Sequence, residues 1–182
     1  TLTPTGLAAL ADELAEFLNA LLGVRRKVLA VDLDNTLWGG VVGEDGVDGL
    51  ALAGDYPGNA YHNFQSFLAN LRASGIALAT VSKNNPEDAH EVFMANPDMP
   101  VSWDHFSSRQ IGWQDKVTGL RAISEALNVG TDSLVFVDDS ATECEMIRTY
   151  LPEVKVINAN VDPSLLAGLV LNVGGLDAVM LT

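Results

Sequence analysis

The sequence predicts an α/β fold of three layers, in which a parallel sheet is covered by helices on both faces. Short apolar runs rich in β-branched residues alternate along the chain with longer segments of helical periodicity, as in repeated strand–helix–strand units. Three of the runs end in polar residues, which fits strands whose carboxyl ends meet a ligand at one edge of a parallel sheet. No internal repeat or long linker interrupts this order.

Length and composition narrow the functional classes. The 182 residues fit one domain, and 48% of them are hydrophobic, so the chain can bury a core. A formal charge of −14 argues against nucleic acid and against anionic membrane surfaces as partners. Cys144 is the single cysteine, which excludes an internal disulfide and favours a reducing, cytoplasmic location. We expect no membrane-spanning segment and no signal peptide.

The first part of the chain predicts a helix followed by a strand. Leucine and phenylalanine recur at helical spacing over residues 7–22, so residues 1–24 are expected to form a docking helix on a compact domain of residues 25–182. The three basic residues 25–27 are most simply a solvated face. Residues 28–31 are all apolar and form the first buried strand.

The middle of the chain predicts a flap and a second strand–helix unit. Residues 39–46 are rich in glycine and are expected to form a hairpin-like flap, because they match neither common phosphate-binding loop. A helix over 59–73 and a buried strand over 76–81 follow. Asn85 and Pro86 are typical of a helix start, with an N-cap side chain before a proline at the first helical position. A short strand is expected over 101–106.

The last third continues the same pattern. Asp115 is expected to cap a helix that reaches Leu127 and carries Lys116 in its first turn. Residues 134–137 form the next buried strand. Expected elements then follow at 143–150 (helix), 154–157 (strand) and 164–170 (helix).

Acidic residues follow two of these strands and point to a metal site. Asp32 and Asp34 alternate with Leu33, so both carboxylates lie on the same side of the chain. Asp138 and Asp139 follow the strand at 134–137. Carboxylates gathered at one edge repel each other unless a cation compensates, and oxygen ligands without His or Cys favour Mg²⁺. For the first pair alone, an ordinary acidic loop is an equally good explanation.

Two further side chains suggest phosphoryl transfer. Ser82 ends the strand over 76–81, and Lys116 lies at a helix N-terminus, where a cation is unfavourable unless it faces an anion. For Lys116 considered alone, a side chain that extends into solvent is an equally good explanation. Together with the four carboxylates, these residues predict a site that handles phosphoryl groups.

These residues resemble the motifs of the haloacid dehalogenase (HAD) superfamily. Asp32-Leu33-Asp34-Asn35-Thr36 matches its DxDxT signature, Ser82 its second motif, Lys116 its third and Asp138-Asp139 its fourth. Residues 32–46, 82–85 and 135–140 are similar to the FkbH-like branch, whose domains occur with polyketide assembly lines. The resemblance implies a Rossmann-like HAD catalytic domain over 25–182. Residues 38–59 and 84–116 are too few for a large cap domain, so we expect only the small flap.

The superfamily resemblance implies a role for each site residue. Asp32 would attack phosphorus, Asp34 would act as acid and base, and Ser82 and Lys116 would hold the phosphoryl oxygens. Mg²⁺ would be held by Asp32, by the Asp34 main-chain carbonyl and by Asp138, with Asp139 as a direct ligand or one that acts through water. The expected substrate contacts are Asn35, Thr36, Trp38, Lys83 and Asn84. Trp38 could instead anchor the flap, and Asn84 could instead cap the turn after its strand.

The FkbH-like resemblance implies a substrate and a partner. The substrate would be a three-carbon acyl phosphate such as 1,3-bisphosphoglycerate, and its glyceryl group would be loaded onto an acyl carrier protein. Leu33 stands between the two acids and cannot carry an acyl group, while Cys144 is expected to be a small packing residue. The attacking thiol would therefore come from the carrier, or from Cys144 if that side chain reaches the site.

Two other functions fit the sequence. One is an open-site phosphatase that acts on a small phosphorylated metabolite or on a phosphoprotein. The other is a docking module of an assembly line that keeps the fold without turnover. Retention of all four motifs favours an enzyme over the docking module.

Overall fold

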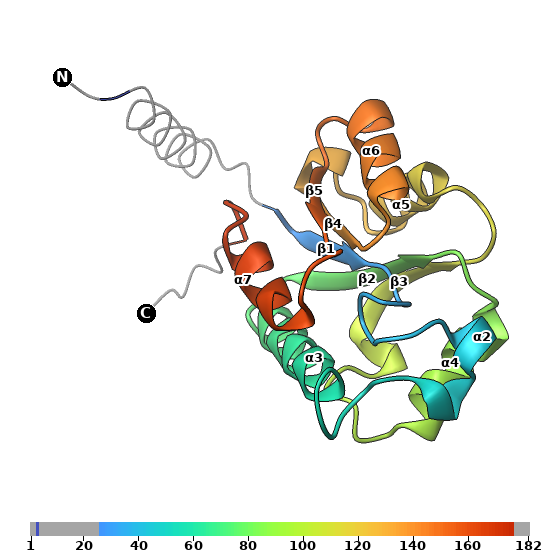
Figure 1. Ribbon diagram of the computed structural model, residues 1–182. Coiled ribbons are helices and arrows are strands. Elements are labelled where there is room, and N and C mark those ends of the chain that lie inside the picture. The colour runs from blue at the N-terminus through green and yellow to red at the C-terminus, as the bar shows by residue number, and fades with distance from the viewer. Residues whose placement is uncertain (1–2, 4–25, 177–182) are drawn as a thin grey trace.

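A computed structural model describes residue 3 and residues 26–176 of the chain. Its centre is one parallel sheet of five strands in the order β3-β2-β1-β4-β5 (Figure 1). The strands span Val28–Val31 (β1), Ala77–Ser82 (β2), Phe106–Ile111 (β3), Leu134–Asp138 (β4) and Lys155–Asn158 (β5). The predicted fold class is confirmed.

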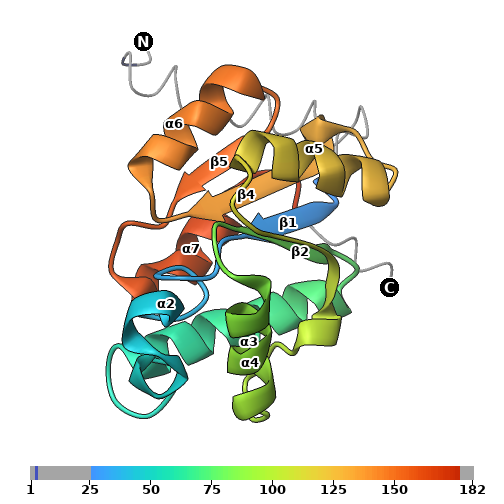
Figure 2. The same ribbon diagram turned by 90° about the vertical axis from the view of Figure 1, so that its right-hand side faces the viewer.

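Helices cover both faces of the sheet. Figure 2 shows α5 and α6 on one side, with α3, α4 and α7 on the other. The α-helices span Val42–Asp45 (α2), Gly58–Ala73 (α3), Pro86–Ala95 (α4), Lys116–Ala126 (α5), Ala141–Tyr150 (α6) and Leu166–Leu171 (α7). Short 3₁₀ turns span Val47–Gly49 (η1), Trp103–His105 (η2), Thr131–Ser133 (η3) and Pro163–Leu165 (η4).

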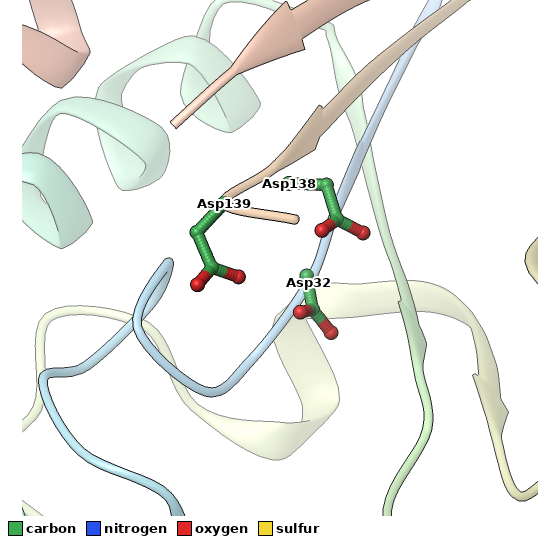
Figure 3. Close-up of side chains that lie close together, drawn as sticks. All are labelled: Asp32, Asp138 and Asp139. Atoms are coloured by element: carbon green, nitrogen blue, oxygen red, sulfur yellow. The ribbon is translucent and has the colours of Figure 1, made fainter. Parts of the chain in front are cut away.

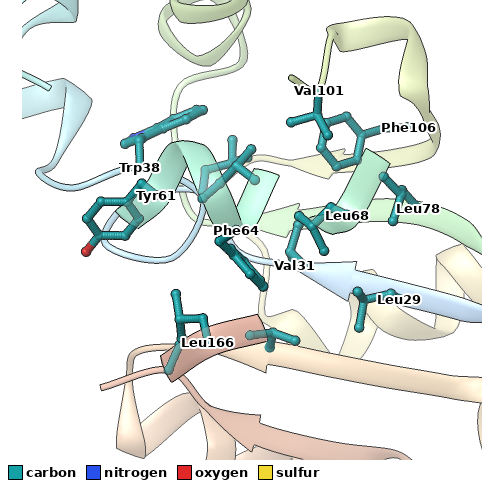
Figure 4. Packing of buried hydrophobic residues seen from close by; sticks show 14 of the residues in the cluster. Leu29, Val31, Trp38, Tyr61, Phe64, Leu68, Leu78, Val101, Phe106 and Leu166 are labelled. Atoms are coloured by element: carbon teal, nitrogen blue, oxygen red, sulfur yellow. The ribbon is translucent and has the colours of Figure 1, made fainter. Parts of the chain in front are cut away.

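Alternate residues of the central strands pack into two separate hydrophobic cores, one on each face of the sheet. Leu29 and Val31 of β1 pack on the face covered by α3, α4 and α7, where Phe64 and Leu68 of α3 are buried (Figure 4). Ala30 lies in the other core, among residues of α5 and α6. Both faces of β1 are therefore buried, which explains why its sequence is a continuous apolar run.

Most predicted elements agree with the structure to within about two residues at each end. The capping predictions are confirmed, since the Asn85 side chain accepts a hydrogen bond from the Glu87 amide and the Asp115 side chain accepts one from the Thr118 amide. The helix predicted over 7–22 and the division at residue 24 lie outside the described residues. Among the described residues, no helix is long and apolar enough to cross a membrane.

Two local predictions are wrong. The strand expected over 101–106 is the 3₁₀ turn η2, and the strand β3 begins only at Phe106. Residues 39–46, which were expected to form a hairpin-like flap, contain the helical turn α2 instead and are followed by the 3₁₀ turn η1. An antiparallel bridge joins Gly39 and Ala51. The segment is nevertheless small, and the described residues form no separate cap domain.

Strand register brings the polar ends of the central strands together. Val31 of β1 pairs with Thr80 of β2 on one side and with Val137 of β4 on the other. The Asp32 amide continues this pairing by donating a hydrogen bond to the Val137 carbonyl at 2.9 Å. The residues that follow all three strands therefore meet at the same edge of the sheet.

Candidate active site

A pocket of about 270 Å³ lies at this edge of the sheet. Its lining comes from the segments that follow β1, β2 and β4 and from the first residue of α5. Most of the lining residues are polar or charged. They are Asp32, Asp34, Asn35, Val41, Ser82, Lys83, Lys116, Asp139, Ser140 and Glu143.

Three carboxylates at this edge form a cluster that can bind a metal ion. Asp32, Asp138 and Asp139 each contribute an oxygen, and these oxygens lie within 4.8 Å of one another (Figure 3). Asp32 Oδ1 is buried and has no hydrogen-bond partner among the described residues. A buried, unpaired carboxylate oxygen is costly, and a metal ion would satisfy it. An all-oxygen ligand set without His or Cys suits Mg²⁺, so the residues present fit the predicted cofactor.

Lys116 compensates part of this negative charge. Its ammonium nitrogen lies 3.0 Å from Asp32 Oδ2 and 2.5 Å from Asp138 Oδ2. The side chain is only 4% exposed, since α5 begins at this residue and points its first turn at the cluster. A buried lysine so close to two acids is held by them and not by solvent.

Burial and mutual repulsion shift the pKa values of these groups. Burial, together with the neighbouring Asp32, raises the pKa of Asp138 to about 7, although Lys116 and the Ser140 amide act in the opposite direction. Burial and Asp32 also raise the pKa of Asp139. For Lys116, burial lowers the pKa, but Asp32 and Asp138 together outweigh it, so the pKa lies above the usual value. The cluster therefore resists full ionisation until a cation joins it.

Asp34 is held by three hydrogen bonds. Its Oδ1 accepts from the Trp38 indole at 2.8 Å and from the Val42 amide at 3.2 Å, and its Oδ2 accepts from the Asn84 side-chain amide at 2.9 Å. Burial nevertheless raises the pKa of Asp34, and Asp32 adds to the rise, while these three donors oppose it. This carboxyl group therefore keeps its proton to a higher pH than an ordinary aspartate.

The residues expected to bind substrate fall into two groups. Asn35 and Lys83 line the pocket, whereas Thr36, Trp38 and Asn84 are buried and do not. Trp38 also packs edge-on against Phe93, at 5.6 Å between ring centroids. Trp38 and Asn84 thus contact Asp34 instead of the pocket space.

Asn35 combines a place in the pocket with a role in its loop. Its φ angle is 54°, a left-handed conformation that asparagine tolerates better than most residues. Its side-chain oxygen accepts a hydrogen bond from the Gly40 amide at 3.0 Å, which holds the turn after the two acids. The hydroxyl of the neighbouring Thr36 is buried without a partner.

Sequence reasoning did not identify Ser140 and Glu143 as pocket residues. The Ser140 side chain caps α6 by accepting a hydrogen bond from the Glu143 amide, and its own amide donates to Asp138 Oδ1 at 2.8 Å. Glu143 lies 2.5 Å from the Lys83 ammonium group. The signal was present in the spacing, since a serine followed three residues later by a glutamate is typical of a helix start.

Cys144 lies outside the pocket. It is buried, and its thiol is 3.4 Å from the Asp138 carbonyl and 3.8 Å from the Ile157 carbonyl, both of which can accept from it. Burial raises the pKa of this thiol to about 11, and Asp138 adds to the rise. Because the thiolate is the reactive form of cysteine, this side chain is a packing residue.

Comparison with known proteins gives related structures. No protein-family model and no curated protein matches the sequence. The N-terminal part of protein BF1531 from Bacteroides fragilis, which contains a phosphatase domain and was crystallised with Mg, is 35% identical with a TM-score of 0.84. That match covers 93% of this chain but 44% of the other, so this chain spans less than half of that length.

A more distant structure agrees with this fold. A HAD family enzyme from Bacteroides thetaiotaomicron, in complex with magnesium and inorganic phosphate, is 13% identical with a TM-score of 0.52. The match covers 72% of this chain and 93% of the other. At this level of identity, the likeness concerns the fold alone.

Proposed function

We propose that this protein is a magnesium-dependent enzyme that removes phosphoryl groups through a covalent intermediate on Asp32. The proposal starts from the HAD fold and from the acidic cluster that can bind Mg²⁺. One observation carries the proposal. Asp32 has one oxygen paired with Lys116 and a second oxygen buried without a partner, within reach of two further carboxylates. A metal ion and a phosphoryl group would complete this arrangement.

Asp32 is the proposed nucleophile. An oxygen of its carboxylate attacks phosphorus, a new O–P bond forms, and the bond from phosphorus to the leaving oxygen breaks. The product is an aspartyl-phosphate. Water then attacks the same phosphorus, which releases inorganic phosphate and restores the carboxylate.

Asp34 is the proposed acid and base. Its raised pKa favours a protonated carboxyl group that donates its proton to the leaving oxygen of a phosphate ester. The resulting carboxylate then accepts a proton from the water that attacks the intermediate. Trp38, Asn84 and the Val42 amide fix the orientation of this carboxyl group.

Ser82 and Lys116 are proposed to hold the phosphoryl oxygens. The Ser82 side chain is buried and lines the pocket, and the Lys116 ammonium lies between Asp32 and Asp138. Asp32, Asp138 and Asp139, with the Asp34 main-chain carbonyl, would hold Mg²⁺, which would offset the charge of the phosphoryl group. The protein side chains would orient the reacting groups.

The proposed substrate is a three-carbon acyl phosphate of the 1,3-bisphosphoglycerate type. Support comes from the FkbH-like resemblance of residues 32–46 and from the pocket volume of about 270 Å³, just below the roughly 300–1,000 Å³ of typical ligand pockets. Loading of the glyceryl group requires a different bond to break. The thiol of an acyl carrier protein attacks the carbonyl carbon, a thioester forms, and phosphate leaves with the electrons of the carbon–oxygen bond.

The thiol for this second reaction would have to belong to the carrier. Cys144 is buried behind Asp138 with a raised pKa, and Leu33 is fully buried. The open pocket, without a cap domain among the described residues, leaves room for a carrier arm to enter.

Phosphate release tests the first part of the proposal. Wild-type protein and the Asp32→Asn variant are incubated with an aryl phosphate and with acetyl phosphate, with Mg²⁺ or with a chelator. We expect release that requires Mg²⁺ and that falls by about 10³-fold or more in the variant. Release that persists in Asp32→Asn or in the chelator contradicts the mechanism.

Mass spectrometry of an acyl carrier protein tests the second part. The carrier is incubated with the enzyme and a glyceryl phosphate anhydride, and the Cys144→Ser variant serves as the control. A glyceryl adduct on the carrier with both proteins supports transfer to the carrier thiol directly. Release of phosphate without any adduct supports the plain phosphatase.

A further inference from the structure

The two cations that line the pocket differ in how they are paired. Lys116 is 4% exposed and contacts both Asp32 and Asp138, so its charge is taken up by the acidic cluster. The Lys83 side chain is 37% exposed, and Glu143 is its hydrogen-bond partner among the described residues. An ammonium group has three N–H donors, so Lys83 keeps donors that can reach the pocket.

The surroundings of Lys83 fix its position. The preceding residue, Ser82, is buried at the end of β2, and the following residue, Asn84, is buried and bonded to Asp34. The Glu143 carboxylate, from the first turn of α6, lies 2.5 Å from the Lys83 ammonium. The ammonium group is therefore held between the segment after β2 and the first turn of α6, at the rim of the pocket, where it can select a ligand.

The charge of the pocket shows what such a lysine can do. Four carboxylates line the pocket, namely Asp32, Asp34, Asp139 and Glu143, against the two lysines, and Asp138 lies directly behind them. A metal ion held by Asp32, Asp138 and Asp139, together with Lys116, would offset the charge of the reacting phosphoryl group. The lining carboxylates would repel a second anionic group on the substrate, while the polar residues Asn35, Ser82 and Ser140 carry no charge. Because Lys116 is already paired with Asp32 and Asp138, Lys83 is the lining cation that can attract such a group.

We propose that Lys83 binds a second anionic group of the substrate and so determines its class. This inference rests on the proposed phosphatase function and adds to it that the substrate is a small phosphate compound with a carboxylate or second phosphate a few bonds from the reacting phosphorus. The small pocket requires this short separation. Glu143 positions the lysine, and the second oxygen of Glu143 is buried without a hydrogen-bond partner in the described part of the chain.

The test compares two three-carbon phosphates that differ in one group. In 3-phosphoglycerate a carboxylate stands where glycerol 3-phosphate has a hydroxymethyl group. The kcat/KM for phosphate release is measured with both compounds for wild type, Lys83→Met and Lys83→Arg. Arg148→Met is the matched control, because Arg148 forms an exposed ion pair with Glu145 on the same helix, α6.

We expect wild type to prefer the carboxylate compound, and Lys83→Met to reduce that preference by about tenfold or more, as the loss of a charged hydrogen bond predicts. Lys83→Arg should recover part of the preference, and Arg148→Met should keep it. Equal losses on both compounds in Lys83→Met would assign Lys83 to the phosphoryl group and overturn the inference. A wild type without preference would overturn it as well.

Failure of the proposed function gives a different result. If wild type releases phosphate from neither compound and also fails to release it from acetyl phosphate at any Mg²⁺ concentration, the phosphatase proposal fails. The dissociation constants of the two compounds are then measured by calorimetry with the same proteins. Tighter binding of 3-phosphoglycerate that depends on Lys83 would still support the anion site, and equal binding would remove it.

Discussion

Replacing Lys116 by methionine tests whether this lysine and a metal ion compensate the same negative charge. Methionine keeps most of the side-chain volume but removes the ammonium group from its positions 3.0 Å from Asp32 and 2.5 Å from Asp138. Because both carboxylates are nearly or fully buried, they cannot recover this loss from solvent. Breaking a buried ion pair by removing one partner costs about 3–5 kcal/mol, so we expect a loss of that size in the metal-free protein.

The loss in the free energy of unfolding caused by Lys116→Met should depend on pH. The pKa of Asp138 is raised to about 7 from an ordinary 3.8, so its contribution to stability is complete below 3.8 and is lost as the pH rises toward 7. Lys116 lowers this pKa, so Lys116→Met raises it further and extends the loss above pH 7. The destabilisation by Lys116→Met should therefore be larger at pH 8 than at pH 6.

The assay is urea unfolding of both proteins at each pH, with a chelator and with Mg²⁺. Mg²⁺ should increase the free energy of unfolding more in Lys116→Met than in wild type, since the variant has more uncompensated charge at the ion site. Arg148→Met is the control, because its exposed ion pair with Glu145 should contribute less than about 1 kcal/mol. Equal Mg²⁺ increments in wild type and Lys116→Met would refute the reasoning.

Three further predictions follow from single contacts. Trp38→Phe removes an indole N–H that lowers the pKa of Asp34, so the pH–rate profile should move to higher pH and kcat should fall roughly tenfold; an unshifted profile would count against a positioning role. Cys144 should react with iodoacetamide at pH 8 at least about 100-fold more slowly in the native protein than in urea, because its thiol is buried with a pKa of about 11; similar rates would show that it is accessible. Gly119→Ala should lower the free energy of unfolding by about 1–3 kcal/mol, since a methyl group would lie 2.6 Å from a β2 side chain. Gly168→Ala, where no atom lies within 4 Å, should instead be neutral or stabilising by up to about 1 kcal/mol in the same urea titration.

The buried central strands and the helix caps could be predicted from the sequence because each depends on residues that are close together in the chain. β1, β2 and β4 are covered on both faces, so each reads as a short apolar run. The caps at Asn85 and Asp115 depend on a single side chain and its next few amides. These features were sufficient to predict the edge of the sheet at which Asp32 and Asp138 meet.

The failures involve segments whose structure depends on distant partners. β3 lies at the edge of the sheet and has alternating buried and exposed residues, including Arg109, so a search for apolar runs placed the strand too early. The turns after Trp38 are helical because they pack beside α4 and donate the Val42 amide to Asp34. Glycine content alone does not contain this information.

The roles of the residues around Asp34 could not be predicted for a similar reason. Asn84 and Asp34 are 50 positions apart in the sequence, and only the fold brings their side chains to 2.9 Å. The ion pair of Lys83 with Glu143 joins residues 60 positions apart. A local motif identifies which chemical groups are present, but their hydrogen-bond partners are set by tertiary structure.

Because β1 pairs with both of its neighbouring strands, the geometry of the site depends on the register of β1. Val31 is aligned with Thr80 and with Val137, and Asp32 is the next residue along. Because side chains alternate in a strand, inserting one alanine inside β1 would turn Asp32 away from Asp138 while leaving a run of apolar residues for the sheet. Such a protein could keep its secondary structure and lose its chemistry, so length changes in this strand should be far less tolerated than in surface loops.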